Sequence, residues 1–220
     1  MEIFNQLWIP LGASVLGGLI TAISNHKINN KKVKSEIVVE ARKEWITNVR
    51  NLVESLVSEL ENNLVIKLQL DDRNNYVISQ FSNPHNIDKD RLNRKEVEKG
   101  ELIEKEAQSA SKIQGINVIF TSYFPNKTDL NLGTEKDNTD NIEIIKKLDN
   151  LLKKHKVYKQ SLGISSITNE SRQTLSKDRL KELLNNQSKS ETEYYRALTD
   201  FTNEFSYYIK KEWERIKKLK

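Results

Sequence analysis

An uncharged stretch near the N-terminus places the strongest constraint on what this chain can fold into. Residues 7–24, LWIPLGASVLGGLITAIS, contain eighteen residues and no charged side chain. As an α-helix they would extend about 27 Å, close to the thickness of the hydrocarbon layer of a bilayer. Trp8 lies at one end, where an amphipathic ring prefers the membrane interface. We therefore predict a transmembrane anchor within residues 1–27.

Two other interpretations of this stretch stay open, a cleaved signal peptide and a buried helix of a soluble protein. A signal peptide begins with basic residues and ends at a cleavage site of small residues. Here the preceding segment holds Glu2 and no lysine or arginine, and no such site follows. A buried soluble helix would suit the moderate hydrophobicity of the stretch. We favour a retained span over both.

Basic residues lie on only one side of the predicted span. The four lysines that follow it are Lys27, Lys31, Lys32 and Lys34. Because positively charged flanks stay in the cytoplasm, the N-terminus is expected outside, and residues 28–220 form a cytoplasmic domain of a cell-membrane protein. The same lysines would attract anionic lipid headgroups, so the lipid membrane is one expected partner.

Small residues recur at helical spacing within the span. One row comprises Ala13, Gly17 and Thr21, and the adjacent row comprises Ser14, Gly18 and Ala22. Such rows let helix backbones approach closely in lipid, which predicts self-association. The alternative is that glycine is simply common in membrane spans.

The remainder of the chain reads as helices. Apolar residues at three- and four-residue steps predict helices over 28–70, 91–113, 142–162 and 176–218. In the first helix the residues expected to face inward are Val38, Ala41, Trp45, Val49, Leu52, Leu56 and Leu60, widened by Val39, Ile46, Val53 and Val57. In the second they are Leu92, Val97, Leu102, Ile103, Ala107 and Ala110, and in the third Ile145, Leu148, Leu151 and Leu152. In the last they are Leu180, Leu183 or Leu184, Tyr194, Leu198, Phe201, Phe205, Ile209, Trp213 and Ile216. The sequence contains only three prolines and seven glycines, and none lies between Gly18 and Pro84, which permits the first helix to continue the span. For residues 116–120 a helical tail is preferred to a strand, because no second strand is available to pair with it. The predicted fold is all-α, an antiparallel bundle of long helices joined to one transmembrane helix.

Two segments each place one tryptophan within an apolar row flanked by charges. These segments supply Arg42, Trp45 and Arg50 near the start of the first helix, and Glu212, Trp213 and Glu214 near the end of the last. We expect the two tryptophans to anchor the core, with the arginines and glutamates paired at its rim. The alternative is that the same residues form a docking surface for a partner.

Motifs for catalysis or metal binding are not found. Without cysteine there is no disulfide, no Cys-ligated zinc and no thiol nucleophile. The three histidines lie far apart, and neither a phosphate-binding glycine loop nor a nucleophile elbow occurs. The acidic pair Asp71–Asp72 is interpreted as a solvated turn. We expect no catalytic residue, no metal, no cofactor and no enzymatic activity.

Charge argues against nucleic acid as a partner. The net charge is only +5, because 36 basic residues are interspersed with 31 acidic ones. A nucleic-acid-binding domain normally concentrates its positive charge in a stripe. The lysines after the span already have an explanation in membrane orientation. A membrane-tethered nucleic-acid binder is therefore the least favoured interpretation.

A resemblance rests on two motifs taken together with the span. Residues 42–50 match R-x-x-W-I-x-x-x-R, and residues 210–217 match K-x-E-W-E-R-[VI]-K. With an N-terminal span these motifs resemble a set of small, mostly uncharacterised bacterial single-pass membrane proteins. Residues 70–175 match no motif of that set. The resemblance implies the architecture and a role in accessory or phage-defence genes, and it supplies no catalytic residue.

These observations favour a membrane-anchored helical module for interaction or signalling, without catalytic activity. Its expected partner is either a second copy of the chain or another protein. The alternative is an oligomeric effector that perturbs the membrane, as a pore-forming or toxic protein, assembled through its transmembrane helix.

Overall fold

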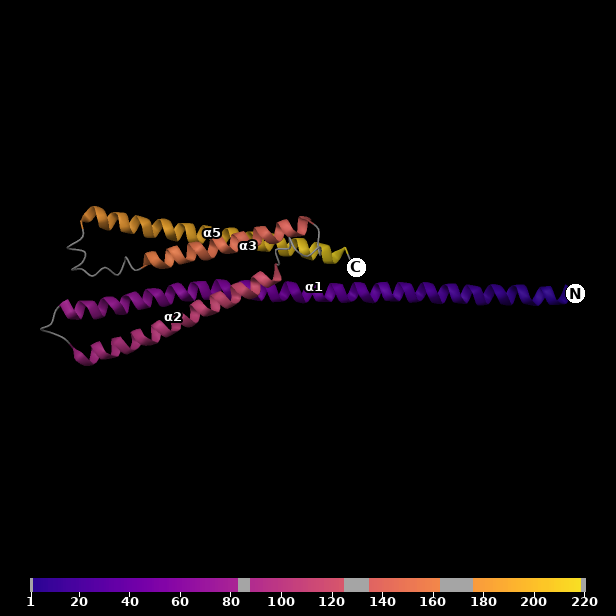
Figure 1. Cartoon of the computed structure of the whole chain (residues 1–220), viewed down its shortest axis with the longest axis horizontal. Helices are drawn as coiled ribbons and strands as arrows, with labels where there is room; N and C mark the ends of the chain where they lie inside the picture. The colour runs from indigo at the N-terminus through magenta and orange to yellow at the C-terminus, as the bar shows by residue number, and fades with distance from the viewer. Residues whose placement is uncertain (1, 83–87, 125–134, 163–175, 219–220) are drawn as a thin grey trace. The chain divides into compact units, whose positions relative to one another are not determined.

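The computed structural model of the chain is helical, as the sequence predicts (Figure 1). It describes the backbone of residues 2–82, 88–124, 135–162 and 176–218. It describes the side chains of residues 33, 35–80, 88–124, 139–162 and 176–218. Within these ranges no strand occurs, so the predicted all-α class is confirmed.

Helix α1 (Glu2–Ser82) is one helix over 81 residues. The predicted end near residue 70 is wrong, because the helix continues through Asp71 and Asp72. Asp71 is buried, and its Oδ1 accepts a hydrogen bond of 2.5 Å from Lys67 Nζ one turn earlier. Ion pairs four residues apart support a helix, so the acidic pair lies within α1 and not in a turn.

Helix α2 (Lys89–Tyr123) begins at an N-cap and extends beyond its predicted end at residue 113. The side chain of Asp88 accepts a hydrogen bond of 3.0 Å from the backbone N–H of Arg91. This contact satisfies one of the free N–H groups of the first turn. Residues 116–120 are helical, as preferred over the strand.

The last helix lies within one residue of its predicted bounds, whereas the third ends as predicted but begins seven residues before its predicted start at residue 142. Helix α3 spans Glu135–Ser161 and helix α5 spans Lys177–Lys217. Ser176 caps α5, since its Oγ accepts a hydrogen bond of 3.2 Å from the backbone N–H of Arg179. Basic residues in the last turn of α5 complement the helix dipole.

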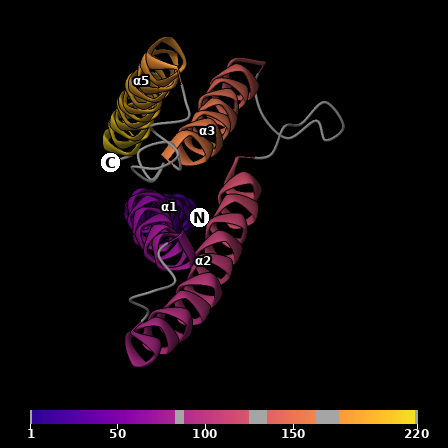
Figure 2. The same cartoon turned by 90° about the vertical axis from the view of Figure 1, so that its left-hand side faces the viewer.

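The chain divides into two compact units, residues 1–47 with 210–220, and residues 48–209. In the larger unit, parts of all four helices form an antiparallel bundle. Figure 2 looks along this bundle, with α1 and α2 on one side and α3 and α5 on the other. The predicted helical bundle is thereby confirmed. The predicted domain boundary at residue 27 lies in the part of α1 whose side chains are outside the description.

The buried stripe of α1 is offset from the predicted one. Its buried apolar residues are Val39, Ile46, Val49, Val53, Leu56, Leu60, Leu64, Ile66 and Leu70. Val38, predicted to face inward, is 44% exposed, and Ala41 is also exposed. The predicted stripe of α1 is wide and includes residues on both sides of the line that contacts the neighbouring helices. Only the residues of that line are buried.

On α2 the predicted apolar face is largely wrong. Val97 is 64% exposed and Ile103 is 49% exposed, whereas Leu102 is buried. The buried face of α2 includes Ser109 and Phe120, which the sequence interpretation left out.

No helix in the part of the chain with described side chains is both long and apolar enough to cross a membrane. The predicted span, residues 7–24, lies outside that part.

Candidate functional site

A layer of buried polar side chains crosses the bundle, and His155 of α3 lies within it. Its imidazole is 7% exposed, and Nε2 lies 3.1 Å from the backbone carbonyl oxygen of Leu60 in α1. Since a carbonyl only accepts, Nε2 carries the hydrogen and donates it. Burial lowers the pKa of His155 to about 4, so the ring is neutral at pH 7.

Tyrosine side chains of α3 and α5 surround this histidine. The fully buried ring of Tyr194 packs edge-on against His155 and is stacked against Tyr158. The hydroxyl of Tyr194 donates a hydrogen bond of 2.9 Å to Glu61 Oε1 on α1. Burial raises the pKa of Tyr158 to about 12, with a further contribution from Glu191. Burial, with a further contribution from Glu61, also raises the pKa of Tyr194, so both phenols stay protonated at neutral pH.

Two further hydrogen bonds join helices in the same bundle. Asn63 Nδ2 of α1 donates to Ser109 Oγ of α2 at 3.1 Å, and both residues are buried. Ser161 of α3 and Ser190 of α5 approach to 2.7 Å between hydroxyl oxygens. Buried polar groups that satisfy one another favour one helix register over alternatives, because a shifted helix would leave them unpaired.

Among the residues with described side chains, no group of three or more His, Cys, Asp or Glu side chains is placed to hold a metal ion.

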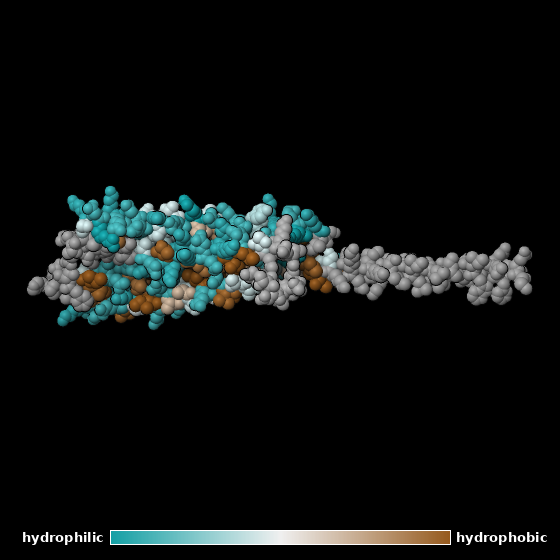
Figure 3. All heavy atoms as spheres, turned by 45° about the horizontal axis from the view of Figure 1, so that its top comes forward, coloured by the Kyte–Doolittle hydropathy of each residue, from teal (hydrophilic) through white to brown (hydrophobic). Residues whose placement is uncertain are grey.

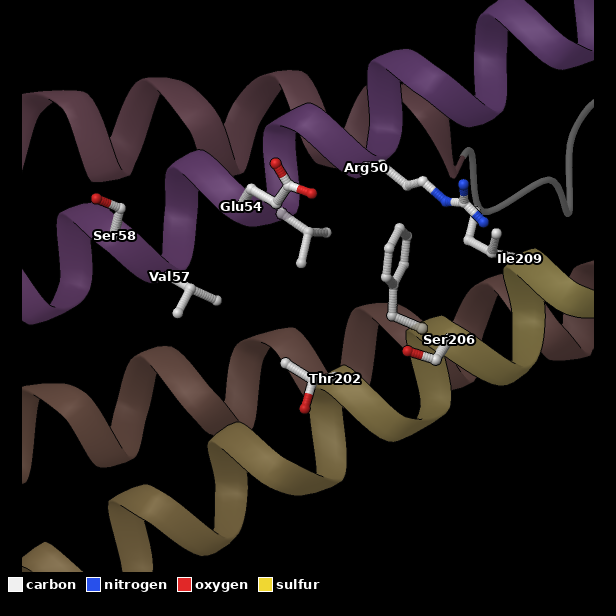
Figure 4. A pocket seen from close by; sticks show the side chains of 9 residues that line it. Arg50, Glu54, Val57, Ser58, Thr202, Ser206 and Ile209 are labelled. Atoms are coloured by element: carbon white, nitrogen blue, oxygen red, sulfur yellow. The ribbon is translucent and has the colours of Figure 1, made fainter.

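A groove between α1 and α5 is the candidate binding site of the larger unit (Figure 4). Its volume is about 600 Å³, within the usual range for ligand sites. Its floor is apolar and is formed by Val53, Val57, Phe205 and Ile209.

The two rims of this groove differ in chemistry. Arg50, Glu54 and Ser58 line it from α1, and Thr202 and Ser206 line it from α5. Arg50 and Glu54 are both exposed, and they lie one helical turn apart. An apolar floor beside one positive and one negative rim group suits an amphipathic segment better than a reacting small molecule.

The predicted membrane residues lie outside the described side chains. The interface set is Trp8, Lys27, Lys31, Lys32 and Lys34. The packing set is Ala13, Ser14, Gly17, Gly18, Thr21 and Ala22. Both sets therefore stay predictions.

The two tryptophans do not both anchor the core. Trp45 is half-buried, but Trp213 is 42% exposed, so its prediction as a core anchor is wrong. The buried position belongs to Glu212, which forms an ion pair with Arg215 of the same helix. Glu214 pairs with Lys217 at 2.8 Å. These glutamates thus have partners on α5 itself, whereas the sequence suggested Arg42 and Arg50.

Sequence reasoning missed His155, although a signal for it was present. Leu148, Leu151, His155, Tyr158 and Leu162 are all buried, and they follow one another at alternating steps of three and four residues. A histidine in such an apolar row occupies a core position. Tyr194, by contrast, was correctly placed in the apolar row of α5.

The rest of the described surface is mixed. On the face drawn in Figure 3, apolar side chains lie among polar ones over the helices.

Comparison of the chain with known family models, curated proteins and solved structures finds no match.

Proposed function

We propose that this protein is a membrane-anchored helical module that binds an amphipathic helix of a protein partner in the α1–α5 groove, without catalytic activity. The observation that carries the proposal is that groove, with its apolar floor and its Arg50–Glu54 rim. A partner helix with an acidic and a basic residue one turn apart would complement both rim charges. The floor would accept its apolar side chains.

Continuity of α1 connects the proposed membrane anchor to the groove. The uncharged stretch 7–24 and the groove residues 50–58 belong to the same helix, Glu2–Ser82. The lysines at 27–34 favour a cytoplasmic bundle and an N-terminus outside. The accessory or phage-defence role implied by the resemblance is compatible with such a module.

Anchoring is tested by extraction of cell membranes with alkaline carbonate. The full chain is expected to stay in the membrane pellet, and a chain that begins at Asn25 is expected in the supernatant. Release of the full chain by carbonate would contradict the anchor.

Partner binding is tested by purification in mild detergent with a groove variant and a matched control. Val57→Asp places a charge on the apolar floor and should abolish a stoichiometric complex. Val65→Asp makes the same change on α1 at a side chain that is 50% exposed and does not line the groove, and it should retain the complex. Equal loss of the complex in both variants, or the absence of a stoichiometric partner for the parent chain, would contradict partner binding in the groove.

A further inference from the structure

Positive charge is concentrated in two segments that belong to the same compact unit. Residues 25–34 and 210–220 together hold ten of the 36 lysines and arginines but only two of the 31 acidic residues. Their combined net charge is +8, so the rest of the chain carries −3. Both segments lie in the unit of residues 1–47 and 210–220. The modest overall charge thus conceals a strongly basic part of the protein.

Membrane orientation explains only the first of these segments. The positive-inside rule applies to basic residues within about 15–20 positions of a span, and residues 210–220 lie far outside that window. The helix dipole acts on the last turn of α5, where it accounts for Arg215 and Lys217. Lys210 and Lys211 precede that turn. Lys210 lies near the Glu214 carboxylate and helps to lower its pKa. Glu212 and Glu214 together offset only two of the five positive charges of residues 210–218.

Burial shows which side of this helix end is available. Ile209 and Ile216 are buried and hold α5 in place. Lys210 and Lys218 are exposed. The side chain of Lys217 is 58% exposed, and its Nζ pairs with the similarly accessible Glu214 at 2.8 Å. Trp213, at 42% exposed, lies among them. Lysines around an exposed tryptophan are the composition of a surface that rests on lipid headgroups.

We propose that the C-terminal turns of α5, with Lys210, Lys211, Trp213, Lys217 and Lys218, form a second membrane contact that binds anionic lipid headgroups. This inference rests on the proposed membrane anchor, which keeps the helix end near the bilayer. The span fixes the chain in the membrane, and the basic surface draws the cytoplasmic unit onto anionic lipid.

The test uses the full chain, which has no cysteine, in vesicles. A single cysteine at Lys218→Cys carries a fluorophore, and lipids with nitroxide headgroups report contact by quenching. Quenching is expected in vesicles of equal parts phosphatidylcholine and phosphatidylglycerol and not in phosphatidylcholine alone. High salt should abolish it, because headgroup attraction is screened. The same label at Ser188→Cys, about 45 Å away along α5, should stay unquenched.

Charge variants separate this surface from a general effect of net charge. Each lysine near an anionic surface strengthens attraction about fivefold. Lys210→Gln with Lys217→Gln should therefore weaken contact roughly 25-fold. Lys146→Gln with Lys153→Gln removes the same charge from exposed positions of α3 and should leave the quenching unchanged.

The outcomes that overturn the proposal are distinct. Failure of the chain to stay in carbonate-washed vesicles would remove the anchor and this inference together. Retention with equal quenching in both lipids, or equal loss in both charge variants, would overturn the inference and leave the anchor intact. Displacement of the label from anionic vesicles by stoichiometric duplex DNA would assign the surface to nucleic acid.

Discussion

At the scale of single residues, the polar layer of the bundle is distinguished by how completely its members are paired. His155, Tyr194 and Asn63 each form a hydrogen bond with a residue of a helix other than their own. A buried polar group without a partner costs about 1–3 kcal/mol, so each pair penalises a misaligned helix. The layer therefore contributes specificity of packing, while the apolar residues around it supply most of the stabilisation.

His155 should make the bundle sensitive to acid. Its pKa is lowered by burial from 6.5 to about 4, so the folded state favours the neutral ring. The unfolded chain binds a proton first as pH falls, and stability is lost between pH 6.5 and pH 4, by about 3 kcal/mol. Urea unfolding of the full chain in detergent at several pH values measures this loss.

The matched variants for this prediction are His155→Gln and Lys156→Gln, the second at an exposed position of the same helix. The first removes the buried titrating group, so its stability should vary less with pH across the same interval. The second should behave as the parent chain. An unchanged pH dependence in His155→Gln would show that other groups cause the acid sensitivity.

Tyr194 should contribute more to stability than its neighbour Tyr195. Tyr194→Phe removes the hydroxyl that binds Glu61, and we expect a loss of about 1–2 kcal/mol. Tyr195 is 45% exposed, so Tyr195→Phe should change stability by less than about 0.5 kcal/mol. Urea midpoints of the two variants compare them directly, and equal losses would contradict a special role for the Tyr194–Glu61 bond.

At the scale of elements, the length of each helix follows from where breakers and caps occur. α1 ends at Ser82, just before Pro84, and passes through the polar segment that follows Leu70. α2 passes through Gly115 without interruption. Glycine lowers helix stability without ending a helix, whereas proline removes a donor and clashes with the preceding turn.

The two glycines of α2 should therefore be sites of stabilisation. Gly100 and Gly115 are exposed within the helix, and an added Cβ would meet no atom within 4 Å at either position. Alanine at each site should raise the free energy of unfolding by up to about 1 kcal/mol. Thermal unfolding of the single variants measures the gain. Destabilisation by either alanine would instead indicate that something packs closely against that face.

At the scale of the whole molecule, the question is whether the span or the bundle drives oligomerisation. The apolar residues found buried in the described part all lie at position 39 or beyond, so a chain that begins at Asn25 retains every one of them. If the span only anchors the protein, this chain and the full chain should share one oligomeric state. Light scattering in detergent, and without it for the shorter chain, measures both masses.

The alternative of a membrane-perturbing effector predicts the opposite result. In that case only the full chain forms a defined oligomer, and Gly17→Leu dissociates it by blocking close approach of the spans. Toxicity on expression should disappear with the same variant. An oligomer that Gly17→Leu leaves intact would exclude packing through the small-residue rows.

The sequence by itself determined the class of fold, the existence of the long helices and much of the apolar row of α5. Periodicity suffices for these features because a helix must bury one face. Only the tertiary structure decided which line of the α1 stripe is buried, that Trp213 faces outward while Glu212 does not, and that His155 meets Leu60. Each of these depends on residues from another helix or another turn, and local spacing carries no information about such partners.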